Sequence, residues 1–285
     1  MASLSWGGAL SCVLLFAAGA IPACGAARSG DEVLGHSVEG REIVARRFGG
    51  GNRSVVFVGG IHGGYEWNSA LLAYRLIDRL EGDADLLPAG LGVVVIPVAN
   101  PDGLARVCGT AGPFDAADAP AVPPADELDL SDPIVRSRFN ANGVDLNRNF
   151  DCAWERRARW RTFEVDAGTK PFSEPETATL RDFFLAEEPT AVVFFHSASN
   201  GVFVEPCAGQ APAGAIELLR AYGDAAGYSV HEGFPHYDVT GNAVGWLLDR
   251  GIPAITVELA THDDVEWERN LAGVNAVLRL YAVSD

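Results

Sequence analysis

Three side chains of types that bind zinc lie shortly after apolar segments. The run Ser54–Val58 leads through two glycines to His62, and Glu66 lies four residues further on. A second run, Ala191–Phe195, is followed directly by His196. A catalytic zinc site takes three protein ligands and keeps a fourth position for a water molecule, which the metal acidifies. Because ligands of α/β sheets bind at the carboxyl ends of strands, we expect His62, Glu66 and His196 to hold one Zn2+ per chain.

A histidine after a strand is more often structural than a ligand, so this interpretation depends on further polar residues. Glu258 lies inside the apolar run Ala254–Ala260, where a carboxylate is costly unless it is paired or used. A desolvated glutamate with a raised pKa is suited to taking a proton from metal-activated water and passing it to a leaving nitrogen. The alternative is a structural glutamate bridged to an arginine at a sheet edge.

The segment from Asn142 to Phe150 combines an acid, several asparagines and an arginine. A turn beside a solvated charge does not explain why Arg148 lies so close to apolar residues. A planar guanidinium with amide donors beside it is a natural receptor for a carboxylate. We therefore expect an anion pocket around Asn147 and Arg148.

Alternating strand and helix patterns must position these residues. Strand-like segments lie at 41–47, 54–58, 92–98, 191–195 and 254–259. Three of them are nearly unbroken apolar sequence, which suggests a sheet that is covered on both faces. Helical spacing of apolar residues is found at 67–80, 174–187, 215–226, 242–250 and 265–281. Ser173 and Glu176 fit a capping box before the second helix, and 109–132 is expected to be a long surface loop. Strands that alternate with helices predict a layered α/β domain.

Composition limits the class of protein. A chain of 285 residues with 48% hydrophobic residues can bury a full core as one domain. Its formal net charge is -17 and its basic residues do not cluster, whereas phosphate binding needs clustered Lys and Arg. We expect no nucleic-acid partner.

The N-terminal residues have the pattern of a secretory signal. An apolar stretch at 9–21 is too short to span a bilayer and is followed by small residues at 23–27. We expect a leader over 1–27, a catalytic domain over 28–285 with no transmembrane span, and export to the periplasm or the extracellular space. The sequence before Cys24 also fits a lipoprotein box, so a lipid anchor at that cysteine is an alternative.

Three cysteines follow the leader, and an exported protein can form disulfides. We expect Cys108 to pair with Cys152, because they flank the loop that leads into the segment around Asp145, which leaves Cys207 as a free thiol. The alternative is three buried thiols.

Several of these motifs resemble the zinc carboxypeptidase family, the carboxypeptidase A-like metallopeptidases, and particularly its bacterial branch. The resemblance covers most of the chain after the leader, and its most specific motifs follow the order of the family: Asn100-Pro-Asp-Gly103, Gly143-Val-Asp-Leu-Asn-Arg-Asn-Phe150, Phe195-His-Ser197 and Thr256-Val-Glu-Leu259. It implies a single three-layer α/β/α domain with a mixed, mainly parallel central sheet.

The resemblance also implies roles for the residues around the metal. His62, Glu66 and His196 are expected to bind zinc, and Asp145 to orient His62 from behind, as metal-bound imidazoles usually require. Glu258 is expected to act first as the general base and then as the general acid.

Further roles concern the substrate. The resemblance implies that Arg138 polarises the scissile carbonyl and stabilises its oxyanion. Asn147 and Arg148 are expected to bind the terminal carboxylate, and Tyr237 to close over the bound end. Two arginines remain alternatives to Arg138, because the sequence does not place the loop between them: Arg106 and Arg136.

The chain departs from the family at two places. The spacing between His62 and Glu66 has one residue more than the usual His-x-x-Glu, and the two glycines between them allow the loop to absorb it. Digestive members carry an arginine shortly after that glutamate, whereas this chain has none before Arg75. We therefore expect a different subsite on the amino side of the cleaved bond. Val244 falls near a specificity position of digestive members, and its apolar side chain does not favour a basic terminal residue.

The activity that follows is hydrolysis of an amide bond next to a free C-terminal carboxylate. Bacterial members include enzymes that trim peptidoglycan stem peptides, so a peptide or a muropeptide is the expected substrate, and a monomer is the expected form. One alternative is deacylation of an N-acyl amino acid, as in the related desuccinylase and aspartoacylase group. Another is a non-catalytic carboxylate-binding module, which has no need of Glu258.

Overall fold

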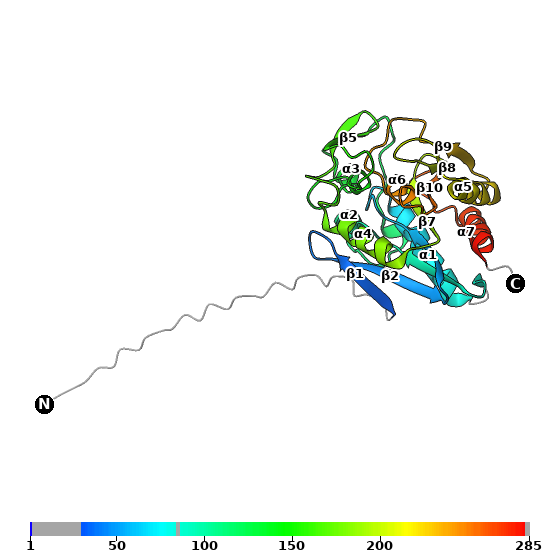
Figure 1. Ribbon diagram of the computed structural model, residues 1–285. Coiled ribbons are helices and arrows are strands. Elements are labelled where there is room, and N and C mark those ends of the chain that lie inside the picture. Colours follow the sequence, from blue (N-terminus) through cyan, green and yellow to red (C-terminus); the bar gives the residue numbers. More distant parts are fainter. Residues whose placement is uncertain (2–29, 84–85, 283–285) are drawn as a thin grey trace.

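The computed structural model describes Met1 and residues 30–83 and 86–282. The expected leader at 1–27 and the alternative of a lipid anchor at Cys24 lie outside the described residues, Met1 excepted. Within the described part, an eight-stranded sheet crosses the molecule (Figure 1) in the order β1-β2-β4-β3-β7-β10-β8-β9. Its strands are β1 (Asp31–His36), β2 (Glu42–Gly49), β3 (Arg53–Val58), β4 (Leu91–Ile96), β7 (Ala191–Ser197), β8 (Gly201–Val204), β9 (Ser229–Glu232) and β10 (Ala254–Leu259).

The sheet is parallel at its centre and mixed at its edges. Neighbours among β4, β3, β7 and β10 run parallel, and β9 runs parallel to β8. Antiparallel pairs join β1 to β2, β2 to β4 and β8 to β10. The carboxyl ends of β3, β7 and β10 therefore meet at one edge of the sheet, where polar residues follow them.

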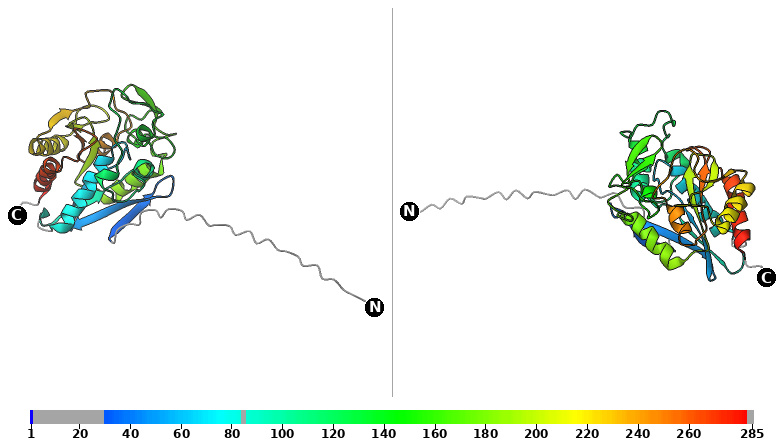
Figure 2. Two further views of the ribbon diagram at one scale, coloured as in Figure 1. Left: turned by 180° about the vertical axis from the view of Figure 1, so that it is seen from behind. Right: turned by 45° about the horizontal axis from the view of Figure 1, so that its top comes forward.

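Helices cover both faces of the sheet, which gives the expected three layers. Figure 2 shows α1, α5 and α7 over one face and α4 and α6 over the other. The helices are α1 (Trp67–Gly82), α2 (Pro101–Cys108), α3 (Pro133–Arg136), α4 (Pro175–Glu187), α5 (Ala213–Ala226), α6 (Ala243–Leu248) and α7 (Trp267–Tyr281). A small hairpin of β5 (Arg157–Trp160) and β6 (Phe163–Asp166) stands apart from the main sheet.

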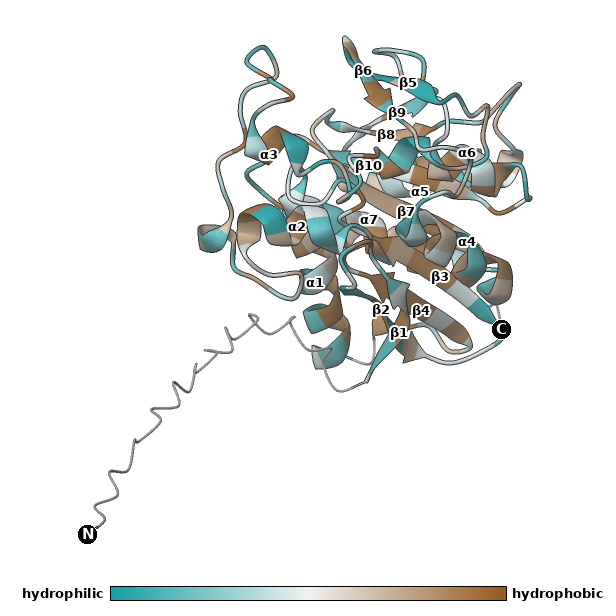
Figure 3. Cartoon of the chain, turned by 90° about the vertical axis from the view of Figure 1, so that its left-hand side faces the viewer, coloured by the Kyte–Doolittle hydropathy of each residue, from teal (hydrophilic) through white to brown (hydrophobic). Residues whose placement is uncertain are grey.

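Burial on both faces explains why the central strands read as unbroken apolar runs. Every residue of β7 and β10 is buried, and the brown strands in the middle of Figure 3 lie between the helical layers. Strand β2, which lies next to the edge strand β1, instead alternates in its first half, with Ile43 and Ala45 buried. Sequence patterns thus predicted the central strands and β2, whereas the edge strand β1 and the four-residue strands β8 and β9 were not predicted. Among the described residues, no helix combines the length and the apolar character that a bilayer crossing requires.

The predicted capping box at α4 is wrong. The helix begins one residue later, because Pro175 occupies its first turn and Glu174 is its N-cap residue. Ser173 Oγ donates to Glu174 instead. Glu176 turns inward, where its carboxylate accepts hydrogen bonds from Val38 N and Asn140 Nδ2. The 109–132 segment is a loop as expected, with one short 3-10 turn at Ala116–Asp118.

The expected disulfide between Cys108 and Cys152 is also wrong. Cys152 is bonded to Cys207, with the two Cα atoms 5.0 Å apart, and Cys108 is a free thiol at the end of α2. Disulfide formation depends on Cα separation and direction, which sequence proximity does not supply. The bond joins the segment after β8 to the end of the Asp145–Phe150 segment.

Candidate metal centre and substrate cavity

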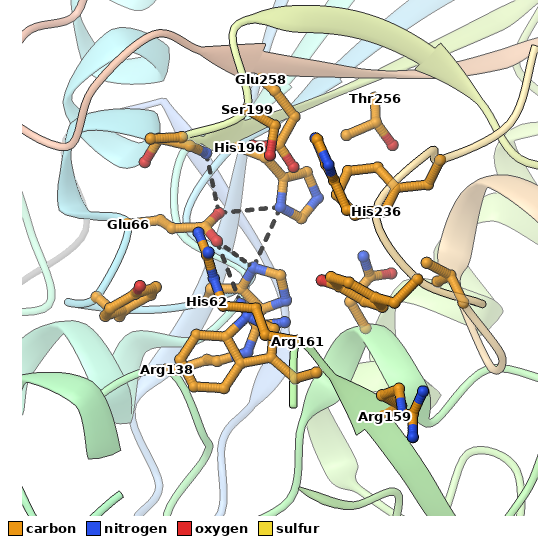
Figure 4. A pocket seen from close by; sticks show the side chains of 18 of the residues that line it. His62, Glu66, Arg138, Arg159, Arg161, His196, Ser199, His236, Thr256 and Glu258 are labelled. Carbon is orange, nitrogen blue, oxygen red and sulfur yellow. Dashed lines mark hydrogen bonds and ion pairs between the residues drawn. The ribbon is translucent and has the colours of Figure 1, made fainter. Parts of the chain in front are cut away.

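Three buried side chains converge at the carboxyl ends of β3 and β7. His62 Nδ1 lies 2.7 Å from Glu66 Oε1, and His196 Nδ1 lies 2.9 Å from Glu66 Oε2. The two Nδ1 atoms are 3.1 Å apart. Within the described residues, these three form a group whose ligand atoms all lie within 4.8 Å of one another. Figure 4 shows them facing a common point, and two imidazoles with one carboxylate are a donor set that suits zinc.

Glu66 reaches this point in spite of the extra residue that separates it from His62. The loop is compact because Gly63 adopts a left-handed conformation (φ +48°) and packs so closely that a Cβ there would lie 2.5 Å from Ser137 O. Glu66 is the residue before α1, and its carboxylate also accepts a hydrogen bond from Ser197 N. Burial alone would raise the pKa of Glu66, but the neighbouring histidines His62 and His196 hold it well below its usual range.

Asp145 and Arg138 lie behind this group and hold it in position. Asp145 Oδ1 is 3.5 Å from His62 Nε2, and its Oδ2 accepts a 2.9 Å hydrogen bond from Arg138 Nε. Arg138 NH1 also reaches Glu66 Oε1 at 3.3 Å, and its guanidinium lies 4.4 Å from the centre of the Trp160 ring. Although Asp145 is buried, Arg138 keeps the pKa of its carboxyl below the ordinary value. Each residue is thus fixed by at least two contacts.

Glu258 lies on β10 beside His196, because their Cα positions pair in the parallel β7–β10 ladder. In Figure 4 it lies on the side of the group away from Arg138. Its Oε2 is buried and has no hydrogen-bond partner among the described residues. Burial and the negative charge of Glu66 raise the pKa of Glu258 to about 8. No arginine at a sheet edge bridges it among the described residues, so the structural alternative finds no partner.

Asn147, Arg148 and Tyr237 lie together on the same cavity wall. Arg148 is buried and has no carboxylate partner among the described residues; it donates to Arg159 O and Asn147 O. Asn147 Oδ1 accepts from Ala243 N, and its amide NH2 is left to donate to a ligand. Tyr237 lies with its ring 5.9 Å from the Arg148 guanidinium. A buried guanidinium that has no carboxylate partner is suited to bind an anionic ligand.

All predicted side chains except Asp145, which lies behind the wall, border one cavity of about 840 Å3. Arg138 borders it, whereas Arg106 and Arg136 do not; Arg106 NH1 donates to Arg136 O on the surface. His236, beside Tyr237 in the chain, also borders the cavity. Val244 is buried in α6 and does not border the cavity.

Several cavity residues escaped the sequence patterns. Arg159 and Arg161 come from the β5–β6 hairpin, which was not predicted, and bring the arginines around the cavity to four with Arg138 and Arg148. Glu205, buried directly after β8, also borders the cavity. An acid that follows the apolar run Gly201–Val204 is the same kind of signal that marked His62 and His196, but the run is too short to stand out.

Comparison with known proteins places this geometry in a family. The profile of the family described as zinc carboxypeptidase matches residues 31–266. Bacteriocin BCN5 of Clostridium perfringens is 28% identical over 265 residues, covering 87% of this chain and 25% of that protein. Murein peptide amidase A of Escherichia coli K12 is 44% identical over 69 residues, covering 21% of this chain and 28% of that protein. The matches thus span only about a quarter of these curated relatives.

A solved structure agrees with the fold. The murein-tripeptide amidase of Escherichia coli O157 aligns with a TM-score of 0.60 at 23% identity, over 92% of this chain and 96% of that one. At this level of sequence identity, the alignment supports a shared fold and nothing further.

Proposed function

We propose an activity on the basis that this chain belongs to the zinc carboxypeptidase family: it hydrolyses the amide bond next to a free carboxylate in a muropeptide or peptide. The observation that carries the proposal is the convergence of His62 Nδ1, His196 Nδ1 and the Glu66 carboxylate on one point. Three ligand atoms this close would repel one another or compete for a proton unless they share a cation.

The proposed zinc ligands are therefore His62, Glu66 and His196. A zinc ion held by them would acidify a bound water molecule and polarise the carbonyl of the scissile amide. Asp145, 3.5 Å from His62 Nε2, would fix the ring so that Nδ1 faces the metal.

Glu258 would take the proton of the attacking water, because it borders the cavity beside His196 and one of its oxygens has no hydrogen-bond partner among the described residues. As the new C–O bond forms, the carbonyl oxygen gains negative charge, which the buried Arg138 guanidinium can stabilise. Glu258 then returns its proton to the leaving nitrogen as the C–N bond breaks. A raised pKa suits a group that accepts and releases a proton within one cycle.

Binding of the terminal carboxylate is assigned to Arg148 and Asn147. Arg148 is buried without an acidic partner among the described residues, and Asn147 can donate from the same wall. Tyr237 would cover the bound end. Holding the terminal carboxylate sets which amide bond reaches the metal, so these residues define the enzyme as an exopeptidase.

Muropeptides are the preferred substrate class in this proposal. Two of the relatives carry murein peptides in their names. Arg159 and Arg161 border the cavity in addition to Arg138 and Arg148, and a guanidinium outside the proposed receptor of the terminal carboxylate suits a substrate that carries a second carboxylate. Stem peptides carry such additional carboxylates.

The test is digestion of muropeptides and of linear peptides with free or amidated C-termini, with and without a zinc chelator, followed by mass spectrometry. We expect loss of the terminal residue from free ends only, abolished by the chelator and restored by zinc. Cleavage that survives the chelator would contradict the metal site. Activity confined to N-acyl amino acids would favour the deacylase alternative.

Export is a further part of the proposal. The Cys152–Cys207 bond supports it, because disulfides persist in oxidising compartments, and the apolar N-terminal pattern fits a leader. Cell fractionation with N-terminal sequencing of the purified protein tests it; a cytosolic protein that starts at Met1 would contradict it. Mass spectrometry of the same N-terminus would detect a lipid on Cys24.

A further inference from the structure

Glu205 is a buried acid without a cationic partner. It follows β8, is 9% exposed and borders the cavity. No ion pair involves it among the described residues, and burial raises the pKa of its carboxyl although His196 and Arg148 counteract this. Carboxylates are almost never buried unless they are paired. The partner of Glu205 is therefore to be sought in the ligand.

A second polar group, the hydroxyl of Thr256, lies near Glu205. Thr256 borders the same cavity, and its Oγ1 is buried without a hydrogen-bond partner among the described residues. Thr256 pairs with Phe203, two residues before Glu205, in the antiparallel β8–β10 ladder. The Thr256 side chain lies close enough to lower the pKa of the Glu205 carboxyl, so the two groups form one polar site on the cavity wall.

The structure holds Glu205 close to the proposed carboxylate receptor. The Cys152–Cys207 bond joins the segment that carries Glu205 to the segment that carries Arg148. Gly245 at the start of α6 packs between them: a Cβ there would lie 2.3 Å from Cys152 Sγ and 2.7 Å from Glu205 O. The two opposite charges are thus presented at a fixed spacing in one cavity.

We propose that Glu205 determines specificity by binding an ammonium group on the side chain of the terminal residue, whose α-carboxylate is bound by Arg148. Diamino acids such as lysine, ornithine and diaminopimelate have this chemistry. The inference rests on the proposed function, because it uses Arg148 as the carboxylate receptor. It reverses the expectation drawn from Val244, which lies outside the cavity wall.

The experiment compares kcat/KM for peptides that are identical except for the terminal residue. That residue is lysine, glutamine or norleucine, each in the L and the D form. Lysine matches norleucine in length but adds the charge. We expect the wild type to prefer lysine, and Glu205→Gln to lower kcat/KM for lysine by about 10-fold to 100-fold, as expected for loss of a buried charge-assisted hydrogen bond. The norleucine substrate should change by less than about threefold.

Glu232→Gln is the matched control. Glu232 is exposed on β9, pairs with Val204 in the neighbouring ladder and does not border the cavity. The substitution is of the same type and changes the net charge by the same amount. The Glu232→Gln variant should therefore prefer lysine as strongly as the wild type does. Equal rates for lysine and norleucine in the wild type, or a lysine preference that survives in Glu205→Gln, would overturn the assignment.

Binding of the free amino acids separates this inference from the proposed function, because it requires no turnover. Calorimetry should show that lysine binds the wild type more tightly than norleucine does, and that Glu205→Gln removes the difference. Selective lysine binding without any hydrolysis would uphold Glu205 and refute the proposed activity. Hydrolysis without selectivity would do the opposite, and failure of lysine to bind would refute the role of Glu205.

Discussion

His62 and His196 lie 134 positions apart in the chain, yet their Nδ1 atoms are 3.1 Å apart in the folded protein. This approach follows from the parallel pairing of β3 with β7, which brings the carboxyl ends of the two strands together. The side chain of Glu66 lies between the two rings and contacts both. The sheet therefore brings the three proposed ligands together, and contacts with neighbouring side chains hold each of them in position.

The first prediction concerns metal content. Glu66→Ala should lower zinc affinity by more than about 100-fold, because removal of a direct ligand costs at least as much as removal of a group behind it. Zinc per chain, measured after dialysis against a weak chelator, checks this. Glu258→Gln is the control, since that residue is not a proposed ligand and should retain about one zinc ion. Full zinc occupancy in Glu66→Ala would mean that the third ligand lies elsewhere.

A second prediction concerns the proton acceptor. Glu258→Gln should lower kcat/KM by roughly 1,000-fold or more, because both proton transfer and electrostatic stabilisation are lost. Zinc content and binding of product amino acids should stay at wild-type levels. The steady-state rates on a muropeptide give the comparison, and turnover close to that of the wild type would eliminate Glu258 as the base.

The disulfide gives a third prediction. Replacing Cys152 and Cys207 together by serine should destabilise the protein by about 4 kcal/mol in the chain-entropy account, given the 55-residue separation. Urea unfolding under non-reducing conditions measures the loss. Cys108→Ser is the matched control, because this half-buried thiol forms no disulfide, and it should stay within about 1 kcal/mol of wild type. Equal stability of the two variants would show that the bond does not form in solution.

A fourth prediction concerns pH and the segment that carries Asp145. Asn140 Nδ2 donates to both Glu174 and Glu176, and Asn140 Oδ1 accepts from Val144 N, which anchors this segment to α4. Burial raises the pKa of Glu176 above its ordinary value of 4.5. An acid whose pKa is raised in the folded protein contributes its full stability below about pH 4.5, where it is neutral in both the folded and the unfolded state. This stability is lost as the pH rises through the folded-state pKa.

Glu176→Gln keeps the side chain neutral at every pH. Its free energy of unfolding relative to wild type should therefore rise from pH 4 to pH 7. Urea titrations of both proteins at several pH values measure this difference. A difference that is constant with pH, or that falls, would contradict the shift. Glu188→Gln, at the exposed residue that follows the same helix, serves as the control because it makes the same change in net charge.

Sequence patterns predicted the layered fold because they are local. The segments that form β3, β7 and β10 are mostly apolar because helices cover both faces of the sheet. A strand of this kind can be recognised in the sequence without knowing which strands pair with it. The same logic predicted His62, His196 and Glu258 at or near strand ends. The motif around Asp145, Asn147 and Arg148 could be recognised in the sequence because all its residues lie within one short segment.

The sequence by itself therefore determined which residue types could form a metal centre and a carboxylate receptor. Only the tertiary structure decided which of them meet: Arg138 rather than Arg106 or Arg136, Cys207 rather than Cys108, and Glu205 rather than Val244 on the cavity wall. These choices depend on strand order and on the hairpin and short strands, which local patterns do not encode. Distances between residues far apart in the chain are set when the sheet pairs and its helices pack, because that is when burial and hydrogen bonding fix one arrangement.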